Sequence, residues 1–170
     1  VSSDIQQALA LGGITDGVTN LEMTAAYATI ANQGTYTRPV FYSQVIDSNG
    51  RVLLDNTTPT THTVLKASTA SLLTQGMTSV ITEGTGKSAK LDGKMPISGK
   101  TGTTSSEYDL WFCGYTPYLT ASIWTGYDEN VSLSGDQAYH ERLWAKIMNQ
   151  IDSVKKYKAK SFKMSKDVKK

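Results

Sequence analysis

The chain has 170 residues, of which 39% are hydrophobic and 19% are charged, and its formal net charge is +2. These values fit one globular domain with a buried core, and no run of about 18 apolar residues is present to cross a membrane. A single cysteine, Cys113, excludes an internal disulfide, and we expect it to be a small buried residue. His62 and His140 have no cysteine or carboxylate at metal-binding spacing, so no metal site is expected.

The positive charge is concentrated at the C-terminal end. Residues 153–170 contain eight lysines and one acidic residue, whereas residues 1–152 carry a net charge of −5. This contrast predicts a domain over 1–152 and a Lys-rich, disordered tail over 153–170. The tail is a candidate contact for an anionic surface or polymer, and a purely solubilising tail is the simpler alternative. A valine at position 1 fits a piece of a longer protein.

The first predicted element is a helix that begins near Thr19. Thr19 and Glu22 have the spacing of a capping box, and Gly34 gives a stop signal after the last turn. Two β-prone runs, 40–47 and 51–55, surround an Asn-Gly pair and predict a hairpin.

The middle of the chain predicts a loop and then a second helix. The threonine-rich stretch 56–63 contains a proline and is interpreted as loop. An apolar stripe predicts a helix over 67–82, which Glu83-Gly84-Thr85-Gly86 ends.

The second half predicts three strands, 95–104, 110–116 and 119–127, followed by a helix over 135–151. Each strand lies a short turn from the next, which is typical of an antiparallel meander. The predicted fold class is α+β, an antiparallel sheet flanked by helices. Four aromatic residues of the last two strands are expected in the core: Trp111, Phe112, Tyr115 and Trp124. Asp109 is expected to accept hydrogen bonds within the hairpin.

The most informative string is Ser-Gly-Lys-Thr-Gly-Thr-Thr at 98–104. A strand that displays Lys100, Thr101, Gly102 and Thr103 along one edge suits a carboxylate and a developing oxyanion. A phosphate-binding loop is the first rival, because Gly-Lys-Ser/Thr occurs at 86–88 and at 99–101. Such a loop needs a glycine five residues before each Gly-Lys pair, and neither site has one.

Acyl transfer by an activated serine is the second interpretation, because Ser-x-x-Lys with Lys-Thr-Gly is a recognised catalytic combination. The only Ser-x-x-Lys lies at 153–156, at the start of the basic tail, where lysine is frequent enough for a chance match. We therefore reject it as the nucleophile. Neither Ser-x-Asn nor Tyr-x-Asn occurs.

Several strings together resemble the transpeptidase domain of class A, bifunctional penicillin-binding proteins. They cover most of residues 8–150, and Asn20, where the family usually has proline, is a mild departure. The strings are Leu-Gly-Gly-Ile-Thr-Asp-Gly-Val-Thr-Asn-Leu-Glu-Met-Thr-Ala-Ala-Tyr at 11–27, Glu-Gly-Thr-Gly at 83–86, the Lys-Thr-Gly string, Asp-Leu-Trp-Phe-Cys-Gly-Tyr-Thr-Pro at 109–117 and Ile-Trp-Thr-Gly-Tyr-Asp at 123–128.

The resemblance implies a β-lactamase/D,D-transpeptidase-like fold of which only the C-terminal part is present, because the family's two serine motifs lie upstream. The resemblance also implies roles for single residues. Lys100 would organise proton transfer together with the side chains of the upstream serine motifs. Thr101 and Thr103 bind the carboxylate of the substrate or of a β-lactam, the Thr103 backbone N–H forms half of the oxyanion hole, and Gly102 permits close approach. No metal or organic cofactor is implied.

The implied activity is serine-type D-Ala-D-Ala transpeptidation, with peptidoglycan stem peptides and β-lactam antibiotics as partners at the extracytoplasmic face of the bacterial membrane. The fragment alone is expected to be inactive without the upstream half of its domain. No nucleic acid partner is expected, and the tail could meet anionic membrane or wall polymer. The alternatives are a non-catalytic peptidoglycan-binding module and a fragment of a β-lactamase-type hydrolase.

Overall fold

The computed structural model describes residues 5–15 and 17–168. The two ends of the chain and position 16 lie outside this part, as do the first residues of the predicted domain and the last two of the predicted tail.

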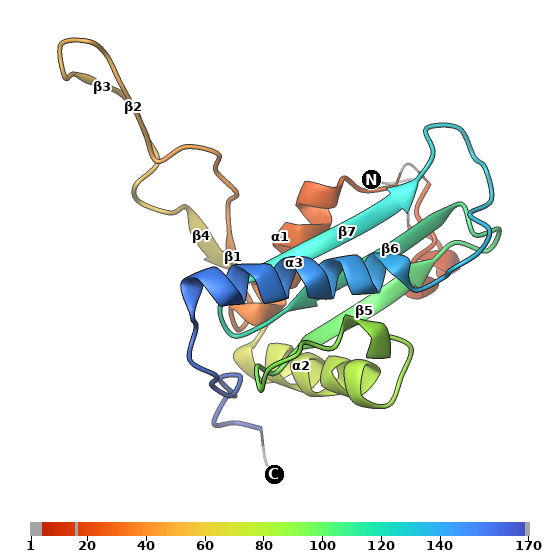
Figure 1. The fold of residues 1–170 in the computed structure, drawn as a ribbon. Helices are drawn as coiled ribbons and strands as arrows, with labels where there is room; N and C mark the ends of the chain where they lie inside the picture. Colours follow the sequence, from red (N-terminus) through yellow and green to blue (C-terminus); the bar gives the residue numbers. More distant parts are fainter. Residues whose placement is uncertain (1–4, 16, 169–170) are drawn as a thin grey trace.

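A three-stranded antiparallel sheet forms the centre of the molecule (Figure 1). Its strands β5 (Ser98–Thr103), β6 (Asp109–Tyr115) and β7 (Thr120–Gly126) follow one another in space as they do in the sequence. Lys100 lies opposite Cys113, and Cys113 lies opposite Ser122 on the next strand. The predicted meander is confirmed.

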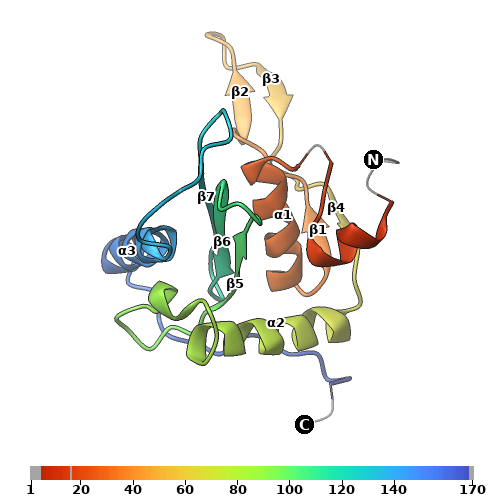
Figure 2. The ribbon, with the colours of Figure 1, turned by 90° about the vertical axis from the view of Figure 1, so that its right-hand side faces the viewer.

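Helices cover both faces of this sheet and one of its edges. Figure 2 shows α1 (Asn20–Ala31) on one face, α3 (Tyr139–Lys155) on the other, and α2 (Ala67–Thr82) along the β5 edge. The predicted bounds of α2 are confirmed, and the short helix η3 (Lys87–Ala89) joins α2 to the sheet beside α3. The arrangement is the predicted α+β architecture.

The main core lies between the sheet, α3 and the end of α2. Phe112 and Trp144 are 0% and 1% exposed, and their rings meet edge to face with centroids 5.2 Å apart. A Cβ at Gly114 would lie 2.6 Å from the Phe112 ring. Position 114 therefore requires a glycine, because a larger residue would collide with this part of the core.

The capping box at the start of α1 is confirmed. Thr19 Oγ1 accepts a hydrogen bond from the Glu22 N–H at 3.2 Å, and the Glu22 carboxylate accepts one from the Thr19 N–H at 2.8 Å. The bonds that the Thr19 N–H and, at 2.8 Å, the Thr19 hydroxyl donate to the Glu22 carboxylate lower the pKa of Glu22. They fix the N-terminus of the helix that covers the sheet.

A small pair of strands was not predicted from the sequence. The strand β4 (Thr61–Thr63) lies within the expected loop 56–63 and pairs with β1 (Thr35–Thr37). The predicted hairpin is present as β2 (Gln44–Ile46) and β3 (Val52–Asp55), and it projects from the body of the molecule (Figure 1). Another short helix, η2 (Gln7–Leu11), precedes α1.

The helix α3 continues to Lys155, past the position 152/153 at which the sequence suggests the start of a tail. Beyond it the ring of Tyr157 stacks on Tyr118, with centroids 4.5 Å apart, and the Tyr118 hydroxyl donates to the Lys158 carbonyl oxygen at 2.8 Å. The aromatic residues interspersed among the lysines give this segment partners on the domain, which a pattern of charge does not indicate. No helix in the described part of the chain is long and apolar enough to span a bilayer.

Candidate functional site

The strand β5 is the terminal strand of the described sheet, and its ladder determines which backbone groups face outward. The Thr104 N–H donates to the Asp109 carbonyl oxygen at 3.2 Å, so this pair is hydrogen-bonded across the strands. In an antiparallel ladder such pairs alternate with pairs whose N–H and C=O groups point away. With the observed register, Thr101 and Thr103 therefore direct their N–H groups away from β6.

Side chains of β5 alternate between the two faces of the sheet. Thr101 and Thr103 share one face, whereas Lys100 and Gly102 share the other. Lys100 is exposed, and its ammonium group folds back along the strand to donate to the Thr101 carbonyl oxygen at 3.0 Å and to Thr101 Oγ1 at 3.4 Å. The structure thus brings Lys100 and Thr101 into contact and places the two threonines on one side, while the roles predicted for these residues stay predictions.

A buried chain of hydroxyl groups anchors the start of this strand to α2. Ser98 is fully buried, and its Oγ donates to the Thr74 carbonyl oxygen at 2.9 Å and lies 2.6 Å from Thr78 Oγ1. Thr74 Oγ1 in turn hydrogen-bonds the Tyr115 hydroxyl at 2.8 Å, and burial raises the pKa of Tyr115. This network holds the residue two places before Lys100. Its only sign in the sequence is the presence of polar residues on the helix 67–82.

Two glycines of β5 lie where the neighbouring strand comes close. A Cβ at Gly99 would lie 2.8 Å from both the Cys113 carbonyl oxygen and the Phe112 ring. At Gly102 the nearest atom would be Trp111 Cβ at 3.3 Å. The close approach of a substrate that the resemblance implies at Gly102 stays a prediction.

A hollow of about 660 Å³ lies beside the C-terminal end of β5. The indole pair Trp111 and Trp124 contributes to its wall, with centroids 6.5 Å apart, together with Thr103 and Met23 of α1. Trp124 Nε1 donates to Asp109 Oδ1 at 2.8 Å, which confirms the bracing role predicted for Asp109. Trp124 is 38% exposed, so its predicted place in the core is wrong, because it lines this hollow.

Two titratable side chains at β6 and the helix α1 that covers it have raised pKa values. Burial raises the pKa of Tyr27 to about 12, with Cys113 and Tyr115 adding to the effect. Burial also raises the pKa of the Cys113 thiol, which is 3% exposed. Cys113 is the small buried residue that the sequence predicted.

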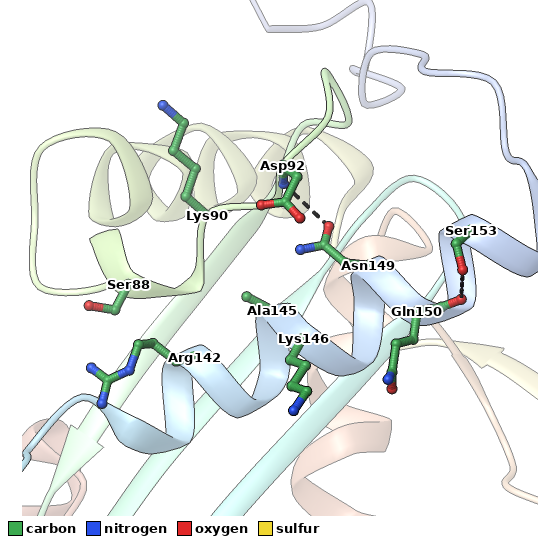
Figure 3. A pocket seen from close by; sticks show the side chains of 9 residues that line it. All are labelled: Ser88, Lys90, Asp92, Arg142, Ala145, Lys146, Asn149, Gln150 and Ser153. Carbon is green, nitrogen blue, oxygen red and sulfur yellow. Dashed lines mark hydrogen bonds between the residues drawn. The ribbon is translucent and has the colours of Figure 1, made fainter.

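A second hollow, of about 510 Å³, lies between η3 and α3 (Figure 3). Its cationic side chains Lys90, Arg142 and Lys146 point away from one another, and Arg142 forms an ion pair with Asp136. Since these groups do not converge on one point, this hollow is a weaker candidate than the edge of β5. Across residues 5–15 and 17–168, no cluster of three or more His, Cys, Asp or Glu side chains could hold a metal ion.

Comparison with known proteins decides the family. The model of the "Penicillin binding protein transpeptidase domain" matches residues 1–151. The chain belongs to the penicillin-binding protein transpeptidase family. It is 39% identical over 141 residues to penicillin-binding protein 1A of Clostridium acetobutylicum, and 37% identical over 152 residues to penicillin-binding protein 1F of Bacillus subtilis. These matches confirm the class A penicillin-binding protein predicted from the sequence.

Solved penicillin-binding proteins share this fold. The penicillin-binding protein PonA1 of Mycobacterium tuberculosis superposes with a TM-score of 0.79 at 27% identity, covering 93% of this chain and 43% of that one. PonA1 in complex with penicillin V gives a TM-score of 0.71, covering 85% of this chain and 40% of that one. The match to the Clostridium acetobutylicum protein spans 83% of this chain but only 17% of that protein. The match to the Bacillus subtilis protein spans 84% of this chain and 21% of that protein.

Proposed function

We propose that this chain supplies the Lys-Thr-Gly wall of a serine D,D-transpeptidase site that is completed by an upstream part of the same domain. The observation that supports this most directly is the outer edge of β5, where the Thr103 N–H points away from the sheet and the Thr101 and Thr103 side chains share a face. An outward N–H suits an oxyanion, and two hydroxyl groups on one side suit a carboxylate.

In this proposal the upstream serine Oγ attacks the carbonyl carbon between the two terminal D-alanines of a peptidoglycan stem peptide. The last D-alanine leaves, a serine ester forms, and the amine of a neighbouring stem takes the acyl group. The Thr103 N–H stabilises the oxyanion, and the Thr101 and Thr103 hydroxyls bind the terminal carboxylate. Lys100 joins the proton-transfer network, and a β-lactam would acylate the same serine. The site would act at the extracytoplasmic face of the membrane.

The test is covalent labelling of the full-length parent protein with a fluorescent penicillin. We expect one adduct, located by peptide mass spectrometry on a serine outside these 170 residues, and no labelling of the isolated chain. Lys100→Ala should slow acylation by about 10²-fold or more, while Lys87→Ala, an exposed lysine on η3, should not.

Each contrary outcome identifies what is wrong. Labelling of the isolated chain would overturn the division of the site between two parts of the domain. Reversible binding of stem peptide by correctly folded parent without any covalent adduct would favour the binding module instead.

A further inference from the structure

The segment Glu-Gly-Thr-Gly at 83–86, which ends α2 and is one of the strings that resemble the family, lies beside the candidate site. Thr85 Oγ1 is 2.7 Å from Thr101 Oγ1, a hydrogen bond between residues 16 positions apart. Thr85 is exposed and Thr101 is half-buried, so this contact contributes little to the core. It places a second hydroxyl group within hydrogen-bonding distance of the one that is proposed to bind the substrate carboxylate.

The two glycines around Thr85 fix its position. The Gly84 N–H donates to the Ser79 carbonyl oxygen and the Gly86 N–H donates to the Val80 carbonyl oxygen, each at 3.0 Å, so the turn satisfies two carbonyl groups of the last turn of α2. A Cβ at Gly84 would lie 2.9 Å from Val80 Cα, and one at Gly86 would lie 3.0 Å from Ile81 Cδ1. The backbone therefore packs against the helix on both sides of Thr85.

The direction of the hydrogen bond follows from the number of protons available. A threonine hydroxyl has one proton to donate and two lone pairs. If Thr101 donates its proton to a carboxylate, then Thr85 must be the donor in the bond between the two hydroxyls. Lys100 Nζ, 3.4 Å from Thr101 Oγ1, also donates to that oxygen. With Thr85 and Lys100 both donating to Thr101 Oγ1, the O–H bond of Thr101 is polarised. Its hydrogen bond to an anion is therefore stronger.

We propose that Thr85 is a positioning residue that orients the Thr101 hydroxyl as a donor to the carboxylate of the substrate or of a β-lactam, an inference that rests on the proposed function. Loss of one neutral hydrogen bond behind this donor should slow acylation by about three- to tenfold. Thr85→Ser keeps the hydroxyl group and should stay within about twofold of wild type. Thr85→Val keeps the shape of the side chain and removes the donor.

The experiment measures second-order acylation rate constants in the full-length parent with a penicillin and with its methyl ester, which lacks the anionic acceptor. We expect Thr85→Val to lower the ratio of the penicillin rate to the ester rate by about three- to tenfold, and Thr85→Ser to restore it. Thr82→Val is the matched control, because this exposed hydroxyl donates only to the Thr78 carbonyl oxygen within its own helix. Melting temperatures of all variants should agree with wild type.

Two results would overturn the inference and leave the proposed function intact. One is an unchanged ratio in Thr85→Val, and the other is an equal loss of rate with both compounds, which would indicate a merely structural role. Absence of any adduct in the wild-type parent would refute the proposed function and this inference together.

Discussion

Replacing Thr103 with proline tests the geometry of β5 and its proposed chemistry at the same time. Proline removes the backbone N–H, and it is tolerated on edge strands where that N–H faces outward. The alternation of the β5–β6 ladder assigns Thr103 such an outward N–H. Gly102, the residue before it, already has the extended conformation that proline favours in its neighbour. The free energy of unfolding should therefore change by no more than about 1 kcal/mol.

The effect on acylation should be far larger. Removing one oxyanion donor typically costs about 10²- to 10³-fold in rate, so Thr103→Pro should slow acylation of the parent by that amount. Thr103→Ala keeps the N–H and loses only the hydroxyl, and it should cost about tenfold or less. The assay is a time course of fluorescent penicillin labelling, with thermal unfolding measured on the same samples.

Two results would refute this reasoning. Equal acylation rates for Thr103→Pro and Thr103→Ala would mean that the Thr103 N–H is not the oxyanion donor. Unfolding of Thr103→Pro while Thr103→Ala remains folded would mean that this N–H belongs to the ladder, and that the alternation inferred for β5 is wrong.

Three further predictions concern the core that supports the site. Trp144→Ala should lower the free energy of unfolding of the parent domain by about 3–5 kcal/mol in denaturant titrations, because the side chain is 1% exposed and its indole donates to the Ala121 carbonyl oxygen; a loss below about 1 kcal/mol would contradict the described core. Burial lowers the pKa of His140 from its ordinary 6.5, so the unfolded chain gains a proton that the folded chain does not. The stability of wild type relative to His140→Gln should therefore fall as the pH drops below about 6.5, and a constant difference would count against a buried neutral imidazole. Cys113 should react with iodoacetamide only after denaturation, whereas rapid alkylation of the native protein would show that β6 is not covered.

The sequence predicted those elements whose signals are local. The α2 helix over 67–82 carries its own apolar stripe, and Thr19 with Glu22 makes a capping box within a single turn. The meander followed from three short strands separated by tight turns. By contrast, the strand at 61–63 pairs with one at 35–37, and a threonine-rich segment contains no information about so distant a partner.

The candidate site also combines a feature that the sequence could reveal with features that depend on distant contacts. The Lys-Thr-Gly string at 100–102 could be found as a motif, but its outward N–H groups depend on the register with β6. The hydroxyl network of Ser98 and the contact from Thr85 to Thr101 each join residues from separate elements. Such contacts arise only when α2 packs along the edge of β5. The nucleophile of the proposed reaction could not be placed, because the two serine motifs that the resemblance implies were not found in these 170 residues.

A crystal structure of the full-length parent acylated by a penicillin tests the central claim most directly. The account predicts that the ester carbonyl oxygen lies about 3 Å from the Thr103 backbone nitrogen and that the penicillin carboxylate accepts hydrogen bonds from the Thr101 and Thr103 hydroxyls. An adduct whose carboxylate and carbonyl oxygen are bound by other residues, with the edge of β5 unoccupied, would contradict it.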